Sequence, residues 1–154
     1  MRREGYIIEE VVEYSNMSDS FDQVLRGTRR KESRQGQWLL AHREEVIREL
    51  SDRIKAGTYT VRDYREREIN ENGKIRRIQI LTMKDRIAVH AVMSVVDRHL
   101  KKRFIRTTSA SIKERGMHDL LAYIHRDMQE QPETTRYCYK FDISKFYESI
   151  DQDT

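Results

Sequence analysis

The feature that constrains the fold most is a turn-forming sequence between two extended runs, followed directly by the start of a helix. Residues 59–81 form two extended runs joined by Asn70-Glu71-Asn72-Gly73, a cluster typical of a β-hairpin turn. Thr82 and Asp85 then form a capping box, which predicts a helix from there to about Arg103 with cations near its C-terminal end. The chain is therefore expected to be α+β, with a mostly helical N-terminal part and a hairpin.

Helical periodicity dominates the residues before the hairpin. Ser18 is positioned to cap a short helix that Gly27 would end. A longer helix is predicted from about Ser33 to Ala56, with Gly57 after its C-terminus. We expect Trp38 of this helix to lie in the core.

Two further segments are expected to be helical. The apolar stretch from Ile87 to Val96 is interrupted by His90 and is far too short to span a bilayer, so it predicts a buried helix. After Gly116, a short helix is predicted for about Met117 to Met128.

Composition allows one domain of ordinary size, or a piece of a larger one, because the chain has 154 residues and 37% apolar content. The single Cys138 excludes an internal disulfide framework and suits a reducing cytoplasm, and the N-terminal residues lack the apolar core of a signal peptide. The five histidines lack the spacing of a zinc motif, so we interpret them as structural or surface residues. We expect a cytoplasmic protein that does not enter a membrane.

Basic residues gather in clusters, against a net charge of only +4. A basic cluster has two interpretations: it is an ordinary solvated part of the surface, or it binds a polyanion such as a nucleic acid. The three clusters are Arg29, Arg30, Lys31 and Arg34; Lys74, Arg76 and Arg77; and Arg98, Lys101, Lys102, Arg103 and Arg106.

The run from Arg136 to Ile143 alternates aromatic and polar residues, the two-residue period of a strand. Asp142 leaves the face opposite the aromatic side chains, and Ser144 can cap a short helix directly afterwards. A carboxylate at such a strand end can bind a hard cation such as Mg²⁺ through oxygen. The alternative is an aspartate that caps a turn.

The order of these parts resembles the reverse transcriptases of bacterial group II introns, retrons and diversity-generating retroelements. The resemblance covers about residues 25–154. It rests on the RRK of 29–31, the GTY of 57–59, GKIRRIQILTMKDRIAVHAVMSVVD from Gly73 to Asp97, RFIRTTSASIKERGMHDLLAYI from Arg103 to Ile124 and KFDISKFYESID from Lys140 to Asp151. It implies an N-terminal helical region in 1–57, the polymerase fingers in 58–132 and the start of the palm in 133–154.

The resemblance also implies roles for particular residues. Asp142 would be a catalytic metal ligand, with the backbone carbonyl of Ile143 as a second ligand, in a two-Mg²⁺ site of the complete enzyme. Tyr147 would close against the sugar 2′-position and select deoxynucleotides, the alternative being a core aromatic on a helix face. Arg76 would grip the incoming triphosphate, although Arg77 stands where many relatives have proline, so the inward-facing member of the pair is open.

Two departures from the family pattern stand out. Many relatives carry a lysine before the hairpin turn, whereas this chain has Ile69-Asn70 and leaves Arg67 or Lys74 as substitutes. The second catalytic block, an aromatic-x-Asp-Asp, does not occur before Thr154. We therefore expect a truncated fragment that is inactive alone.

The resemblance implies an RNA-directed DNA polymerase, a nucleotidyltransferase that uses an RNA template, a DNA primer and deoxynucleoside triphosphates. RNA contacts are expected from Arg29, Arg30, Lys31, Arg34, Lys113 and Arg115. One alternative is a maturase-like RNA-binding module without polymerase activity. Another is a helical scaffold with incidental charges, which would show no salt-dependent RNA affinity.

Overall fold

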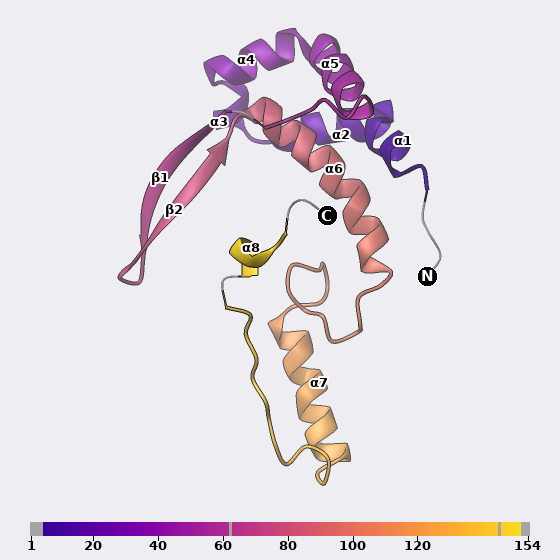
Figure 1. Ribbon diagram of the computed structural model, residues 1–154, viewed down its shortest axis with the longest axis vertical. Helices are drawn as coiled ribbons and strands as arrows, with labels where there is room; N and C mark the ends of the chain where they lie inside the picture. Colours follow the sequence, from indigo (N-terminus) through magenta and orange to yellow (C-terminus); the bar gives the residue numbers. More distant parts are fainter. Residues whose placement is uncertain (1–4, 62, 145, 152–154) are drawn as a thin grey trace. The chain divides into compact units, whose positions relative to one another are not determined.

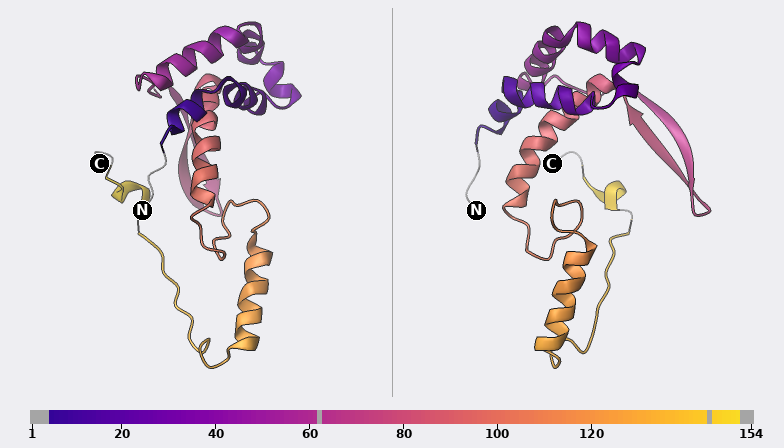
Figure 2. Two further views of the ribbon diagram at one scale, coloured as in Figure 1. Left: turned by 90° about the vertical axis from the view of Figure 1, so that its right-hand side faces the viewer. Right: turned by 180° about the vertical axis from the view of Figure 1, so that it is seen from behind.

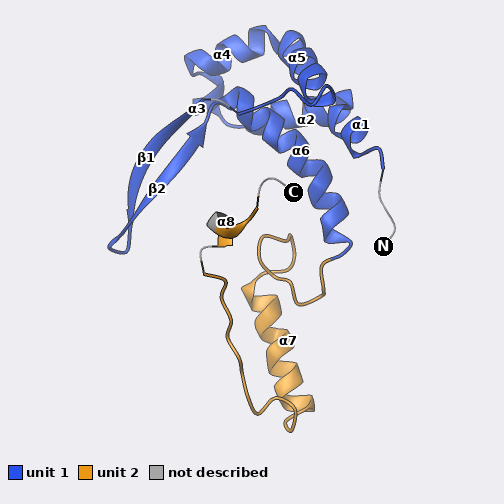
Figure 3. Ribbon diagram, viewed as in Figure 1, with its two compact units in different colours: residues 1–103 blue, residues 104–154 orange. Residues whose placement is uncertain are grey.

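The computed structural model describes residues 5–61, 63–144 and 146–151, without the side chains of Tyr147 and Glu148. Helices and one antiparallel hairpin make up its regular structure, so the predicted α+β class is confirmed (Figure 1). The chain divides into two compact units, unit 1 (residues 1–103) and unit 2 (residues 104–154) (Figure 3). In chain order the elements are α1 (Ile7–Val12), α2 (Tyr14–Val24), α3 (Thr28–Lys31), α4 (Arg34–Ala41), α5 (Arg43–Lys55), β1 (Tyr64–Glu71), β2 (Lys74–Leu81), α6 (Met83–Lys101), α7 (Met117–Glu130) and α8 (Phe146–Ser149).

The core of unit 1 lies between α2 and α6, with α1, α4 and α5 packed around them. Helix α2 contributes Met17 and Phe21, which lie one turn apart and are fully buried. The junction of α1 and α2 is tied to α6 by Asn16, whose Nδ2 donates to the Ala91 carbonyl (3.1 Å) while its Oδ1 accepts from the Ser94 hydroxyl (2.7 Å). The core residues are Val11, Met17, Phe21, Val24, Leu25, Leu39, Val46, Ile47, Leu50, Ile54, Ile87, Ala88, Ala91 and Val95.

Helix α6 buries one face rather than its whole circumference. Ile87 and Val95 are fully buried, whereas Val89 and Met93 are exposed, Met93 by 51%. The expectation of a wholly buried helix over 87–96 is therefore wrong on the outer face, because no described element of unit 1 covers that side. The capping box at its start is confirmed, since the backbone N–H of Asp85 donates to the Thr82 Oγ1 (3.1 Å).

The single helix predicted from Ser33 to Ala56 is interrupted at His42, where the backbone leaves helical geometry (φ −113°, ψ 26°). This break lets Leu39 of α4 and Leu50 of α5 both reach the core. Trp38 is 49% exposed and stacks on the His42 ring with centroids 4.5 Å apart, so the expectation that it lies in the core is wrong.

The beginning of α2 also differs from the sequence expectation. Ser18 lies inside the helix, which begins four residues earlier at Tyr14. Instead of capping the helix, the Ser18 hydroxyl accepts a hydrogen bond from Arg43 Nη2 of α5 (2.7 Å). The Ser18 hydroxyl oxygen, which the local sequence predicts to cap the helix, is therefore bound by Arg43, a residue distant in the sequence.

The predicted hairpin is confirmed, with β1 beginning at Tyr64. Its turn residues Asn72 and Gly73 both have positive φ (54° and 84°), as the preferred two-residue hairpin turn requires. The Asn70 side chain accepts from the Gly73 N–H (2.8 Å) and fixes the turn. Within unit 1 the hairpin projects away from the helices (Figures 1 and 2).

Unit 2 consists of a loop, α7, an extended segment and the short α8. Arg106 anchors the loop to α7 because its guanidinium binds both carboxylate oxygens of Asp119 (2.7 and 2.8 Å) and lies over the Tyr123 ring (4.6 Å). None of the described residues of unit 2 is buried. The apolar stripe of α7 is exposed, including Leu121 and Met128.

The strand predicted over Arg136–Ile143 is wrong, because the sheet of the described residues consists of β1 and β2 alone. A strand is held by hydrogen bonds to a neighbour, and this segment has no such neighbour among them. The alternation is nevertheless visible in Tyr139 and Phe141, whose rings stack with centroids 6.3 Å apart. The short helix expected after Ser144 is α8.

Candidate nucleic-acid interface

The register of the hairpin sorts its side chains onto two faces of opposite electrostatic character. Residues directly opposite one another in an antiparallel pair lie on the same face, and the face alternates along each strand. Ile69 pairs with Arg76, and Glu68 pairs with Arg77, so the two adjacent arginines lie on opposite faces. One face, here called the basic hairpin face, carries Arg65, Arg67, Lys74 and Arg76 with the single carboxylate of Glu71.

The surroundings of Arg76 and Arg77 differ accordingly. Arg76 Nε lies 2.6 Å from Glu71, at the end of the basic hairpin face. Arg77 lies 3.8 Å from Glu66 and 3.9 Å from Glu68, so the opposite face carries two carboxylates against one arginine. Arg76 is therefore the member of the pair that shares a face with Arg67 and Lys74.

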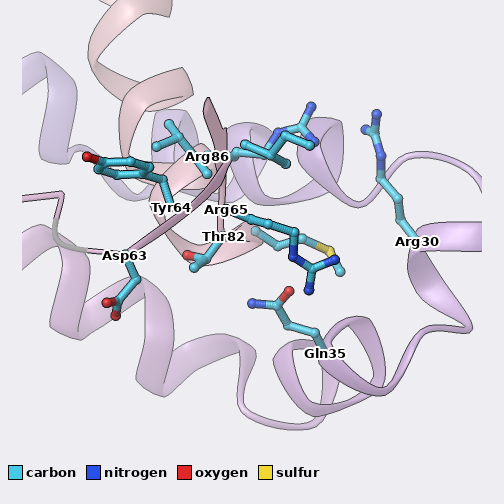
Figure 4. A pocket seen from close by; sticks show the side chains of 10 residues that line it. Arg30, Gln35, Asp63, Tyr64, Arg65, Thr82 and Arg86 are labelled. Atoms are coloured by element: carbon cyan, nitrogen blue, oxygen red, sulfur yellow. The ribbon is translucent and has the colours of Figure 1, made fainter. Parts of the chain in front are cut away.

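A hollow of about 610 Å³, here called the base groove, lies where the hairpin joins the helices. Its polar lining comes from three separate parts of unit 1, and Figure 4 shows Arg65 extending toward the side where Gln35 lies. A second cavity of about 400 Å³ shares Arg30, Leu81 and Arg86 with it, so the two are adjoining parts of one surface. The base groove is lined by Arg30, Gln35, Asp63, Tyr64, Arg65, Ile80, Leu81, Thr82, Met83 and Arg86.

Backbone contacts hold Arg30 of the base groove in place. Arg30 Nη1 donates to the Val24 carbonyl (2.9 Å), which fixes one end of its guanidinium. A side chain at Gly36 would lie 1.9 Å from the Arg30 carbonyl oxygen, so only glycine lets α4 approach α3 this closely. Among the described residues, the guanidinium groups of Arg65 and Arg86 have no hydrogen-bond or ion-pair partner, which leaves their donors available to an anion.

Tyr59 fixes the segment that leads into the hairpin. Its hydroxyl donates to Asp85 Oδ1 (2.5 Å), and the other carboxylate oxygen accepts from the Thr82 hydroxyl (2.6 Å). Arg53 lies over the Tyr59 ring at 5.2 Å. Burial, together with the hydrogen bond to Asp85, raises the pKa of Tyr59 above its usual value, so the phenol stays protonated and keeps donating.

The other expected RNA contacts lie in both units. In unit 1, Arg29, Lys31 and Arg34 are exposed on α3 and at the start of α4, next to Arg30. In unit 2, Lys113 is exposed, whereas Arg115 Nη1 donates to the Ile105 carbonyl (3.3 Å) and so helps to hold the loop before α7.

The expected metal ligands lie in the extended segment of unit 2. The side chains of Asp142 and Ile143 are exposed. Within the described ranges, no group of three or more His, Cys, Asp or Glu side chains could hold a metal ion. Of these two residues, only Asp142 contributes a carboxylate. Tyr147 lies in α8, and its side chain is outside the described part of the structure.

Sequence reasoning missed Arg65, Arg86, Gln35 and Asp63 as site residues. Arg65 and Arg67 stand two residues apart, a spacing that places both on one face of a strand, so a signal for Arg65 was present. Arg86 lies within the segment from Gly73 to Asp97 that carries the resemblance, but no role was predicted for it.

No protein-family model and no curated protein matches the chain. None of the helices in the described ranges has the length and apolar character needed to cross a membrane.

Proposed function

We propose that this chain contributes the template and nucleotide contacts, and one catalytic aspartate, of an RNA-directed DNA polymerase from a bacterial retroelement. The observation that carries the proposal is the basic hairpin face. The sequence resemblance implies a triphosphate contact at Arg76 or its neighbour Arg77, with Arg67 or Lys74 in place of the family's lysine, and the strand register gives Arg67, Lys74 and Arg76 the same face. Arg77, which stands where many relatives have proline, lies near two carboxylates on the other face, and this favours Arg76 as the contact.

In this proposal the two cation types do different work. The planar guanidinium of Arg76 offers paired donors to the oxygens of a triphosphate, whereas Lys74 adds a compact charge near the turn. Asp142 and the carbonyl of Ile143 are proposed as ligands of Mg²⁺, which would favour attack by a primer hydroxyl. Tyr147 is proposed to select deoxynucleotides. The cytoplasmic location of the protein stays a prediction.

Primer extension on an RNA template tests the polymerase, with Mg²⁺ and deoxynucleotides, in the complete natural protein that carries these residues. We expect Asp142→Asn to abolish DNA synthesis, because it removes the negative charge of an oxygen ligand to a hard cation. Cys138→Ser, an exposed neighbour in the same segment, is the matched control and should retain activity. Synthesis that survives Asp142→Asn would refute the role of this carboxylate.

A second candidate, an RNA-binding module without polymerase activity, is favoured by the base groove. Its arginines can hold phosphates without any catalytic aspartate. The two functions separate in one pair of assays. RNA binding without synthesis in the wild-type protein would favour the module, whereas synthesis that depends on Asp142 would favour the polymerase.

A further inference from the structure

The base groove contains one carboxylate among its arginines. Asp63 immediately precedes β1 and lines the groove together with Arg65, Arg86 and Arg30 (Figure 4). It makes no hydrogen bond or ion pair with any described residue. A bare carboxylate weakens the attraction of the site for phosphate, so its position calls for a ligand group that can donate a hydrogen bond.

The remaining lining suits a single nucleic-acid strand. Three arginines from α3, β1 and α6 offer donors to successive phosphates. Tyr64 is half exposed and pairs with Leu81 across the hairpin, and Met83 is a further apolar residue of the lining. A cationic groove with an aromatic ring and apolar side chains is the usual arrangement for unpaired bases, which need a surface on which to stack.

RNA carries the hydrogen-bond donor that a carboxylate in such a groove can use. The ribose 2′-hydroxyl can donate to an acceptor, and DNA lacks this group. We propose that the base groove binds single-stranded RNA, with Arg30, Arg65 and Arg86 on the phosphates and Asp63 accepting a hydrogen bond from a ribose 2′-hydroxyl. This inference rests on the proposed RNA-binding function and adds to it a means of distinguishing RNA from DNA.

Fluorescence anisotropy with the 154-residue chain tests the role of Asp63. The probes are single strands of about ten nucleotides with one sequence, as RNA, DNA and 2′-O-methyl RNA. Wild type should bind RNA more tightly than the other two, because only RNA donates from the 2′-position. Asp63→Ala should weaken RNA binding about three- to tenfold through the lost hydrogen bond, and should tighten DNA binding through the lost negative charge.

The control for charge alone is Glu66→Ala, which removes one carboxylate from the opposite face of the hairpin. It should leave the ratio of RNA to DNA affinity unchanged. If Asp63→Ala tightens RNA and DNA by the same factor, Asp63 acts only as a repulsive charge and the proposal is overturned.

The arginines are tested through the salt dependence of RNA binding. Removing one phosphate contact lowers the slope of log K against log salt by about 0.7 for a single strand, so Arg65→Ala and Arg86→Ala should each produce that change. Arg48→Ala, an exposed arginine of α5 outside the groove, should leave the slope unchanged.

The outcomes separate this inference from the proposed function. Failure of wild type to bind any RNA at low salt would refute both. RNA binding that requires Arg76 but is indifferent to Arg65, Arg86 and Asp63 would leave the proposed function standing and overturn the groove as the RNA site.

Discussion

Units 1 and 2 use similar apolar patterns with opposite results. In unit 1 the helical spacing of Met17 and Phe21 puts both side chains in a closed core, and every buried apolar residue of the described chain lies between Val11 and Val95. In unit 2 the stripe of α7 and the aromatic side chains of 137–143 stay exposed, Phe141 by 87%. Periodicity therefore selects which side chains share a face, but a second surface is needed before that face is buried.

Polar contacts differ between the units in the same way. Unit 1 combines its core with partly buried contacts such as the one between Tyr59 and Asp85. In unit 2, Arg106 holds the loop onto α7 through an exposed ion pair with Asp119 and a contact with the Tyr123 ring. Exposed ion pairs contribute little to stability, so unit 1 is the part of the chain that can hold the basic hairpin face and the base groove in fixed positions.

The largest expected contrast comes from truncating one apolar residue in each unit. Phe21→Ala should lower the free energy of unfolding by about 3–5 kcal/mol, because it opens a cavity in a closed core. Leu121→Ala should change it by less than about 0.5 kcal/mol, because that side chain is 60% exposed. Urea unfolding followed by circular dichroism measures both. Equal effects would contradict the contrast between the units.

A smaller effect is expected at the contact that fixes the entry to the hairpin. Tyr59→Phe removes the hydrogen bond to the Asp85 carboxylate and should cost about 1.5 kcal/mol of stability, the lower end for a bond to a charged group. Tyr64→Phe is the matched control, since the Tyr64 hydroxyl has no hydrogen-bond partner among the described residues. The same urea unfolding assay measures both variants. An equal loss of unfolding free energy in both would show that the hydrogen bond from Tyr59 to Asp85 adds no stability of its own.

The smallest effect is the pH dependence from Asp22. Its hydrogen bond with Arg43 lowers the pKa of Asp22 below the usual 3.8, so the pair stabilises the fold above that pH and loses this contribution as pH falls through the lowered value. Asp22→Asn should cost less than about 1 kcal/mol at pH 7, because the pair is partly exposed to solvent. Unfolding free energy measured from pH 7 to pH 2.5 should show the two proteins converge in acid; a constant difference would assign the effect to packing.

Local signals predicted much of the fold of unit 1. The turn at Asn72-Gly73 and the cap at Thr82 depend on neighbouring residues only, and both are confirmed. The break at His42 and the long-range use of Ser18 depend on residues distant in sequence, so local periodicity could not predict them. The strand expected over 136–143 failed for a related reason, because strand formation requires a partner.

The candidate site was predictable in part. Arg76, Lys74 and Arg67 follow from the resemblance, but their common face follows from the strand register. The base groove joins residues from Arg30 to Arg86, which come together only where α3, α4 and the start of α6 meet the base of the hairpin. Sequence spacing carries no information about such a groove until the helices are placed.

RNA affinity of Arg76→Ala and Arg77→Ala tests most directly the claim that one face of the hairpin binds phosphate. The two variants remove the same charge from adjacent residues, so net charge and position along the strand are matched. Titration of single-stranded RNA at several salt concentrations should show weaker binding and a salt slope lower by about 0.7 for Arg76→Ala, with little change for Arg77→Ala. Equal losses in the two variants would contradict the assignment of phosphate contacts to the basic hairpin face.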